Sequence, residues 1–234
     1  FFRIFYVVFL DHQEVYILAL AVIAMLTITW GNVAALTQKN VKRLLAYSSI
    51  SHAGFVIMGL VAGTEAGVTG AAVYLMAYTF MNLGIWAVVI LLRRQDILGE
   101  NLEDFEGLFF RRPGIAVLML VFFLSLAGIP PLAGFVAKYM VFAAIVQVAV
   151  SGAEHASLMV CLAVVGALNV VVSLYYYFRI VVYMFMEEQY VPSRLSFSVG
   201  LVVVLVITGL LTILIGIYPQ PFINLARAAS LPLI

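Results

Sequence analysis

Long apolar blocks alternate with short polar stretches along almost the whole chain. A helical block of about 20 residues crosses the ~30 Å hydrocarbon layer of a bilayer, because each residue adds 1.5 Å. Each block has to be helical, since lipid offers no partner for a free backbone N–H or C=O. The pattern predicts one partial and six full crossings, over residues 1–10, 15–37, 44–62, 68–92, 115–150, 156–186 and 197–218.

The block at 115–150 is too long for one straight crossing, and it contains the pair Pro130-Pro131. Both prolines lack an N–H, and the neighbouring Gly128 and Gly134 tolerate unusual backbone angles. We therefore expect this helix to be broken in the middle of the membrane. Breaks at that depth persist where they line protein or a water-filled cavity, and ion sites form there.

Composition agrees with an all-α polytopic membrane protein made of a single transmembrane domain, 1–234. The chain is 65% hydrophobic and only 10% charged, with a mean hydropathy of +1.17. A soluble domain of this size needs far more polar surface. The net charge of +1 gives no basic face for nucleic acid. Phe1 opens inside an apolar run, so we interpret the chain as part of a longer protein.

The charged residues of the predicted loops are distributed unequally between the two sides. One set of alternate loops carries the basic residues Lys39, Lys42, Arg43, Arg93, Arg94, Arg111, Arg112 and Arg194. The facing loops carry Asp11, Glu14, Glu65 and Glu154. Because basic loops stay in the cytoplasm, we expect the C-terminus, with Arg227, on the outer side of the membrane.

Lys138 is the first candidate for chemistry, because it lies deep inside an apolar block. It precedes the outer end of its block by about a dozen residues, or roughly 18 Å. A charged lysine at that depth costs about 2.5–3.5 kcal/mol or more, and burial favours the neutral amine. Such an amine can take up and release protons. The alternative is a structural lysine that reaches the interface or pairs with an acid.

His52 is the second candidate, because histidine titrates near neutral pH and can relay protons. The alternative is a hydrogen-bonded histidine that only packs, and this interpretation is slightly favoured when His52 is taken alone.

Two stripes of polar residues recur at helical spacing, so the members of each stripe share one face. One stripe is Tyr74, Tyr78 and Asn82, and the other is Asn169, Ser173 and Tyr177. Such stripes either join helices to one another or line a hydrated path. Tyr78 and Asn82 are therefore possible relay residues beside Lys138.

The chain lacks the motifs of several enzyme classes. It has no HExxH, no G-x-S-x-G, no Walker A sequence and no dinucleotide-binding fingerprint. The three histidines are scattered, which does not suggest ligands for haem or a metal. We expect no cofactor and no redox centre in this chain.

Four segments resemble the antiporter-like subunits of respiratory complex I. The stretch NVKRLLAYSSISHAG at 40–54 is similar to their loop-and-helix signature, and SLAGIPPLAGFVAK at 125–138 is similar to their second broken helix. The stretches SLYYYFR at 173–179 and YPQP at 218–221 resemble subunit N, the bacterial homologue of mitochondrial subunit 2.

The resemblance implies a fourteen-helix fold with two inverted repeats, of which this chain matches the second, from the end of helix eight onward. Lys138 matches the lysine of helix twelve, which belongs to a mid-membrane axis of charged residues and to the outward-leading half-channel. The other residues of the axis would precede Phe1. Tyr78 and Asn82 occupy the helix on which other antiporter-like subunits carry a histidine.

The same resemblance implies a proton-translocating subunit of NADH:quinone oxidoreductase in a bacterial inner membrane. Its partners would be other membrane-arm subunits of complex I, with quinone, FMN and iron–sulfur clusters held elsewhere in the complex. Three alternatives stay open: a subunit of a multisubunit cation/proton antiporter, subunit 2 of the ferredoxin-dependent photosynthetic complex, and a structural scaffold.

Overall fold

A computed structural model describes residues 13–93, 100–152, 155–186 and 199–230. The predicted segment 1–10 and the charges of Asp11, Arg94, Glu154 and Arg194 lie outside these residues. All named elements of the described part are helices: α1 (Gln13–Leu36), α2 (Val41–Val61), α3 (Glu65–Arg93), the 3-10 helix η3 (Leu102–Phe105), α4 (Leu108–Arg111), α5 (Pro113–Ala127), α6 (Ala133–Val150), α7 (Ala156–Met186), α8 (Val199–Ile217) and α9 (Gln220–Ser230).

Six of these helices are long and apolar enough to cross a membrane: α1, α2, α3, α6, α7 and α8. The shorter apolar helix α5 precedes α6. The predicted all-α polytopic class is confirmed. Helix α2 begins at Val41, earlier than the predicted 44, because Asn40 caps it by accepting the Arg43 N–H at 3.1 Å.

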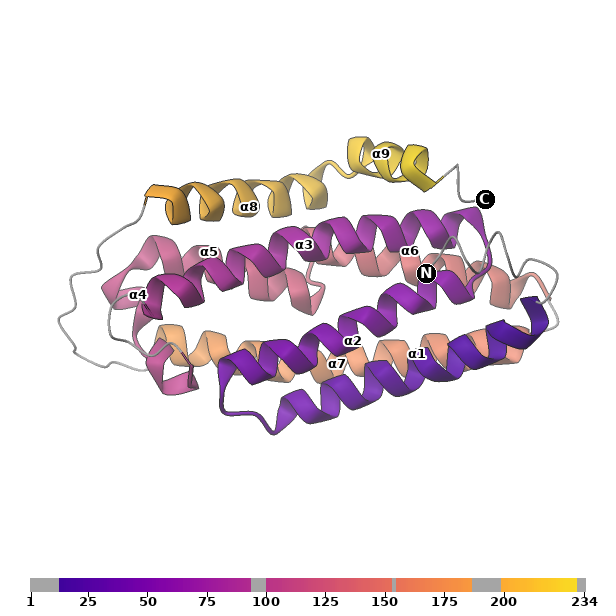
Figure 1. The fold of residues 1–234 in the computed structure, drawn as a ribbon, viewed down its shortest axis with the longest axis horizontal. Coiled ribbons are helices and arrows are strands. Elements are labelled where there is room, and N and C mark those ends of the chain that lie inside the picture. Colours follow the sequence, from indigo (N-terminus) through magenta and orange to yellow (C-terminus); the bar gives the residue numbers. More distant parts are fainter. Residues whose placement is uncertain (1–12, 94–99, 153–154, 187–198, 231–234) are drawn as a thin grey trace.

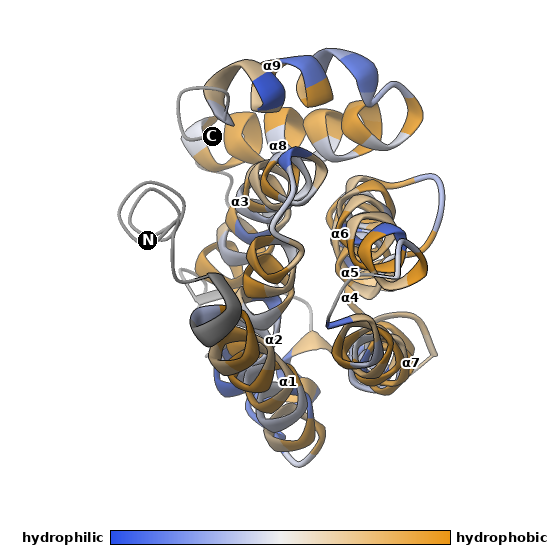
Figure 2. Cartoon of the chain, turned by 90° about the vertical axis from the view of Figure 1, so that its right-hand side faces the viewer, coloured by the Kyte–Doolittle hydropathy of each residue, from blue (hydrophilic) through white to orange (hydrophobic). Residues whose placement is uncertain are grey.

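The long helices form two layers (Figure 1). Helices α1, α2, α3 and α8 follow one another in the first layer, and α5, α6 and α7 form the second (Figure 2). The layers meet where α3 packs against α5 and α6, and where α1 packs against α7. Side chains between the layers are therefore enclosed by protein even though the outer surfaces are apolar.

The predicted break lies between α5 and α6, in the centre of the second layer. Gly128 caps the C-terminus of α5, and its left-handed backbone (φ 88°) lets its N–H bond back to the carbonyls of Leu124 and Ser125. Pro130 and Pro131 follow, and α6 starts at Ala133. The Gly134 N–H donates to Ser125 Oγ at 2.9 Å, so one hydroxyl links the two half-helices.

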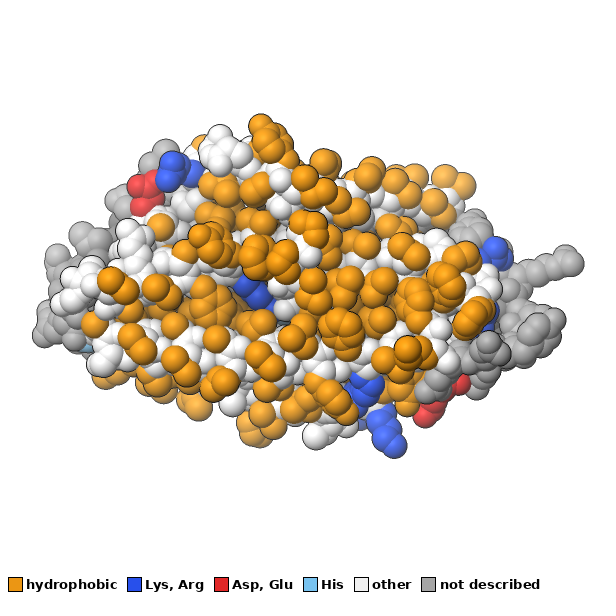
Figure 3. Space-filling view, turned by 180° about the vertical axis from the view of Figure 1, so that it is seen from behind, with side chains coloured by type: hydrophobic (Ala, Val, Ile, Leu, Met, Phe, Trp, Pro, Cys, Tyr) orange, Lys and Arg blue, Asp and Glu red, His pale blue; other side chains and the backbone are white. Residues whose placement is uncertain are grey.

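Most charged side chains lie toward the two ends of the bundle, and the surface between them is largely apolar (Figure 3). At one end Lys42 pairs with Glu100 at 2.6 Å, which holds the α1–α2 connection against the segment that follows α3. At the other end Arg227 of α9 pairs with Glu65 at the start of α3, at 3.1 Å. The described basic loops thus share one end, and Arg227 lies at the opposite end, as the sequence predicts.

The pattern of apolar blocks does not predict helix α9, because Pro219 and Pro221 favour an end to the last crossing. Pro221 instead occupies the first turn of α9, where a missing N–H costs nothing. The helix lies across the end of the bundle rather than along it (Figure 2) and contacts α3.

Candidate functional site

Lys138 lies in α6, just after the break, and is almost fully buried, with 6% of its surface exposed. Its Nζ donates hydrogen bonds to the carbonyl oxygens of Leu126 at 2.9 Å and Ala127 at 3.1 Å. These carbonyls belong to the last turn of α5, where a helix leaves its C=O groups without intrahelical partners. The C-terminal end of a helix also carries a partial negative charge, which favours a cation there. The broken helix therefore supplies the acceptors that hold the amine.

Gly128 lets the lysine approach this end of α5. A Cβ added at Gly128 would stand 2.9 Å from Lys138 Cδ, inside van der Waals contact, and the positive φ also disfavours any side chain there. The glycine predicted to tolerate the break thus also makes room for the amine.

Lys138 faces an aromatic ring and no carboxylate among the described residues. Its Nζ lies 5.5 Å from the centre of the Phe55 ring, within the range of a cation–π contact. Lys42 and Arg227 form ion pairs at the two ends of the bundle, far from this amine. The side chain points inward to α5, so it does not reach for the membrane interface.

A cavity of about 300 Å³ adjoins the amine and opens on the outer face of α6 and α7. Its lining residues are Gly128, Phe135, Lys138, Tyr139, Phe142, Ala167 and Val170. Figure 3 shows the surrounding face, where a basic side chain lies in a hollow among apolar ones. The lining of the cavity is apolar apart from Lys138 and Tyr139.

His52 sits between two tyrosines of different helices. Its Nδ1 lies 2.7 Å from the Tyr74 hydroxyl on α3, and its Nε2 lies 3.0 Å from the Tyr177 hydroxyl on α7. The Tyr177 hydroxyl also bonds Ser48 Oγ, one turn before His52 on α2. A neutral imidazole donates through one nitrogen and accepts through the other. The chain Ser48–Tyr177–His52–Tyr74 can therefore point in either of two directions.

The two candidate residues Tyr78 and Asn82 are placed differently. The Tyr78 ring packs against the His52 ring, with centres 4.8 Å apart, but both nitrogens of His52 bond other tyrosines. Asn82, one turn further along α3, is partly buried and stands outside the hydrogen-bonded chain of described residues. Of the first polar stripe, Tyr74 therefore contributes most directly to the site.

The members of the second polar stripe also differ in their hydrogen-bond partners. Tyr177 joins the His52 chain, whereas Ser173 bonds the Val170 carbonyl of its own helix at 2.7 Å. Asn169 bonds Asn32 of α1 at 3.1 Å. Sequence reasoning missed Asn32 and Tyr176, although an asparagine inside an apolar block is itself a signal of a buried partner.

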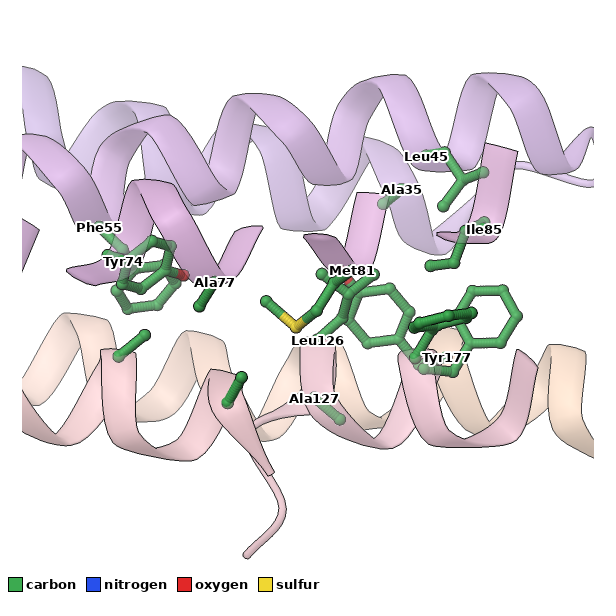
Figure 4. Close-up of a cluster of buried hydrophobic side chains, with 14 of the residues drawn as sticks. Ala35, Leu45, Phe55, Tyr74, Ala77, Met81, Ile85, Leu126, Ala127 and Tyr177 are labelled. Carbon is green, nitrogen blue, oxygen red and sulfur yellow. The ribbon is translucent and has the colours of Figure 1, made fainter. Parts of the chain in front are cut away.

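Phe55 connects the neighbourhood of His52 with that of Lys138. Its ring lies against the Tyr74 ring (Figure 4), with centres 6.1 Å apart and planes 17° apart. The Phe55 ring also faces Lys138 Nζ. Lys138 and His52 are not hydrogen-bonded to each other. A proton passing between them requires a water molecule or a side-chain movement around Phe55.

Arg179 has a structural place at the basic end of the bundle. Its guanidinium donates to the carbonyls of Leu36, at 3.2 Å, and of Gln38, at the C-terminus of α1. A cation is favourable at that end of a helix. In the part of the chain that the structure describes, no cluster of three or more His, Cys, Asp or Glu could hold a metal ion.

The chain is similar to one family of membrane proteins. The family model for the NADH:quinone oxidoreductase/Mrp antiporter transmembrane region matches residues 1–166. NADH-quinone oxidoreductase subunit N 2 of Solibacter usitatus is 52% identical over 211 residues, covering 90% of this chain and 41% of that protein. Subunit N 1 of Koribacter versatilis is 47% identical over 229 residues, covering 96% and 43%. The chain thus spans about two-fifths of the length of these curated relatives.

Solved structures show the same arrangement of helices. A chain of respiratory complex I from Thermus thermophilus with bound Aureothin is 30% identical, with a TM-score of 0.67 over 88% of this chain and 44% of that one. A chain of the Mrp complex from a Dietzia species is 19% identical, with a TM-score of 0.86 over 99% and 50%. The second likeness concerns the fold alone.

Proposed function

This chain belongs to the NADH:quinone oxidoreductase/Mrp antiporter transmembrane family, and we propose that it carries protons across a bacterial inner membrane as a subunit N-like part of complex I. One observation carries the proposal: a buried amine is hydrogen-bonded to the C-terminal carbonyls of a broken helix, beside a cavity that opens to the surface of the chain. The subunit N names of the relatives that are 52% and 47% identical support the choice of complex.

Lys138 is the residue that takes up and releases the proton. Burial favours its neutral form, while the carbonyls of Leu126 and Ala127 favour its charged form. When two such effects oppose each other, an electrostatic change of about 1.4 kcal/mol alters the ratio of the two forms tenfold. A modest displacement of charge nearby is enough to load or unload the amine.

His52 relays protons toward this amine through Tyr74 and Tyr177. Each hydroxyl and the imidazole can accept a proton on one side and release one on the other. Tyr78 lies against the imidazole and Asn82 follows on the same helix, so both have a secondary place in the relay.

The driving force comes from outside this chain. Quinone reduction in partner subunits would displace charge along the membrane arm, and FMN and iron–sulfur clusters would belong to those partners. The chain itself acts as a translocating, non-redox subunit. Its basic end, with Lys39, Lys42 and Arg43, faces the cytoplasm, and its C-terminal end, with Arg227, faces outward.

The test is Lys138→Met in the complete complex, reconstituted in vesicles. We expect proton pumping to fall roughly tenfold or more, because methionine keeps the volume of the side chain but carries no proton. The matched control is Lys39→Met, since Lys39 is exposed at the basic end. Wild-type pumping by the Lys138→Met complex would exclude this residue as the carrier and favour a structural scaffold.

A subunit of a multisubunit cation/proton antiporter is the second candidate, because the family model spans both kinds of complex and the Mrp chain shares the fold. The two candidates differ in their partners. Purification of the full-length protein together with quinone-reducing subunits would support complex I, and purification without them, with Na⁺-dependent proton flux, would support the antiporter.

A further inference from the structure

The ring of Phe55 contacts both the amine of Lys138 and the hydrogen-bonded chain that contains His52. Phe55 lies on α2, one turn after His52, and only 2% of its surface is exposed. Its ring is stacked with the ring of Tyr74 (Figure 4), whose hydroxyl lies 2.7 Å from His52 Nδ1. Lys138 Nζ lies over the same Phe55 ring. An apolar side chain is thus in contact with both candidate proton carriers, which share no hydrogen bond.

The attraction between this ring and the amine depends on the charge of the amine. The face of an aromatic ring carries partial negative charge and attracts a cation within about 6 Å of the ring centre. Lys138 Nζ lies 5.5 Å from the centre of the Phe55 ring. Both side chains are buried, so little water screens the attraction. A neutral amine is not attracted in this way, so the contact is stronger when Lys138 carries the proton.

The other contacts of the amine do not separate it from the His52 chain. The carbonyls of Leu126 and Ala127 accept hydrogen bonds from Nζ on the side of α5, but a carbonyl stays neutral and takes no proton. A returning proton would pass from the ammonium, by way of the Tyr74 hydroxyl, to His52, and would leave a neutral amine and a charged imidazole. Because Phe55 contacts both Tyr74 and the amine, its ring lies on this route.

We propose that Phe55 is a positioning residue that keeps the proton on Lys138 from returning to the His52 chain. Its π face attracts the ammonium once the proton has arrived, and its apolar bulk separates the amine from the Tyr74 hydroxyl. The inference rests on the proposed proton relay and adds its direction. Arrival requires the ring to move away from a neutral amine, whereas return requires it to move away from a charged one. The barrier to return is therefore higher by the strength of the cation–π contact.

The experiment replaces Phe55 with monofluoro-, difluoro- and trifluorophenylalanine in the complete complex, reconstituted in vesicles. Ring fluorine atoms weaken the attraction for a cation and change the shape of the ring little. We expect the number of protons pumped per quinone reduced to fall stepwise along the series. The total decrease should be about threefold, which corresponds to the weaker cation–π contacts. The rate of quinone reduction should not change.

The matched control is the same series of fluorinated residues at Phe105. This ring is also fully buried, but it lies in η3 at the basic end of the bundle, away from Lys138. Fluorine at Phe105 should leave both the pumping ratio and the rate of quinone reduction unchanged.

Two further variants separate the π face of the ring from its bulk. Phe55→Leu keeps the apolar bulk but has no π face, so it should pump like the trifluorinated variant. Phe55→Ala removes both, and we expect it also to raise the passive proton leak of the vesicles, measured without an electron donor. If Phe55→Ala fails to assemble, Phe55→Val replaces it, because valine removes less volume.

Wild-type pumping along the whole Phe55 series would overturn the inference, and so would a wild-type leak in Phe55→Ala or its replacement. Equal losses in the Phe55 and Phe105 series would overturn it too, since they would show a general effect of fluorine. Normal pumping by Lys138→Met contradicts the proposed function itself. Loss of pumping in Lys138→Met together with normal pumping by every Phe55 variant contradicts only this inference.

Discussion

Lys138 donates its hydrogen bonds through Nζ, and the acceptors are two backbone carbonyls of α5. A hydrogen bond from a charged donor contributes about 1.5–3 kcal/mol, and a lysine charge at mid-membrane costs about 2.5–3.5 kcal/mol or more. The two bonds and the cost are of the same size. In the proposed function, these opposing contributions let the amine change between its charged and neutral forms, with no carboxylate beside it among the described residues.

Gly128→Ala tests the close approach between the lysine stem and the end of α5. The new methyl group would stand 2.9 Å from Lys138 Cδ, and the left-handed backbone costs about 1–2 kcal/mol for any residue with a Cβ. We expect a lower thermal midpoint and reduced pumping in the complex. Gly114→Ala is the control, since no atom lies within 4 Å of a Cβ at that position. Equal midpoints for the two variants would contradict the contact.

His52→Gln separates hydrogen bonding from proton relay. Glutamine can donate to one tyrosine and accept from the other, but it does not exchange protons as imidazole does. We expect normal assembly with pumping reduced by roughly tenfold. His155→Gln, at the start of α7, should pump like wild type. Wild-type pumping by His52→Gln would show that this histidine only packs.

For single residues, the sequence predicts how deep a charged side chain lies in the membrane better than it predicts hydrogen-bond partners. A lysine inside an apolar block is conspicuous whatever surrounds it, so the sequence alone indicates Lys138. The pairing of His52 with Tyr74 and Tyr177 depends on how three helices are rotated. Helices as apolar as these have little polar contrast between their faces. The sequence therefore could not show that Asn82 stands outside the hydrogen-bonded chain, or that Asn32 bonds Asn169 and Tyr176.

Among the helices, some features follow directly from the sequence and others depend on packing between helices. Lipid forces every crossing to be helical, so the crossings follow from hydropathy. The break follows from Pro130 and Pro131, which cannot complete the backbone ladder. Helix α9 follows from neither rule, because Pro221 can end one helix or begin another, and its contact with α3 decides between them.

Ser125→Ala tests the link between the half-helices. Ser125 is fully buried, and its hydroxyl accepts the Gly134 N–H at 2.9 Å. Removing the acceptor leaves a buried donor unpaired, which costs about 1–3 kcal/mol. We expect a lower thermal midpoint than for Ser151→Ala, whose hydroxyl is exposed at the end of α6. A midpoint equal to wild type would mean that another group, such as water, replaces the hydroxyl.

At the scale of the whole molecule, an ion pair joins neighbouring segments at each end of the bundle. The basic end is closed by Lys42 with Glu100, and the opposite end by Arg227 with Glu65. Exposed pairs of this kind contribute only about 0–1 kcal/mol each. Their value is geometric, because they hold the connecting segments at opposite ends of a bundle whose surface is otherwise apolar (Figure 3).

Cysteine labelling tests the orientation of the bundle. In a Cys161→Ser background, we expect Ala228→Cys to react with an impermeant maleimide added outside the cell membrane, because the proposed topology places α9 at the outer end. Lys39→Cys should react only after the inner side is opened. Both positions are exposed. The reverse pattern would place the basic end outside and contradict the proposed topology.

The two hydrogen bonds from Lys138 Nζ to backbone carbonyls determine which of its hydrogens is available for release. An ammonium group has three hydrogens, and only two of them are bound to Leu126 and Ala127. The hydrogen that departs is the third, so the neutral amine keeps both of its anchors and gains a lone pair where the third hydrogen was. In the proposed function, the amine can then be loaded and unloaded at a nitrogen that stays in place, and neither half-helix has to move for each proton.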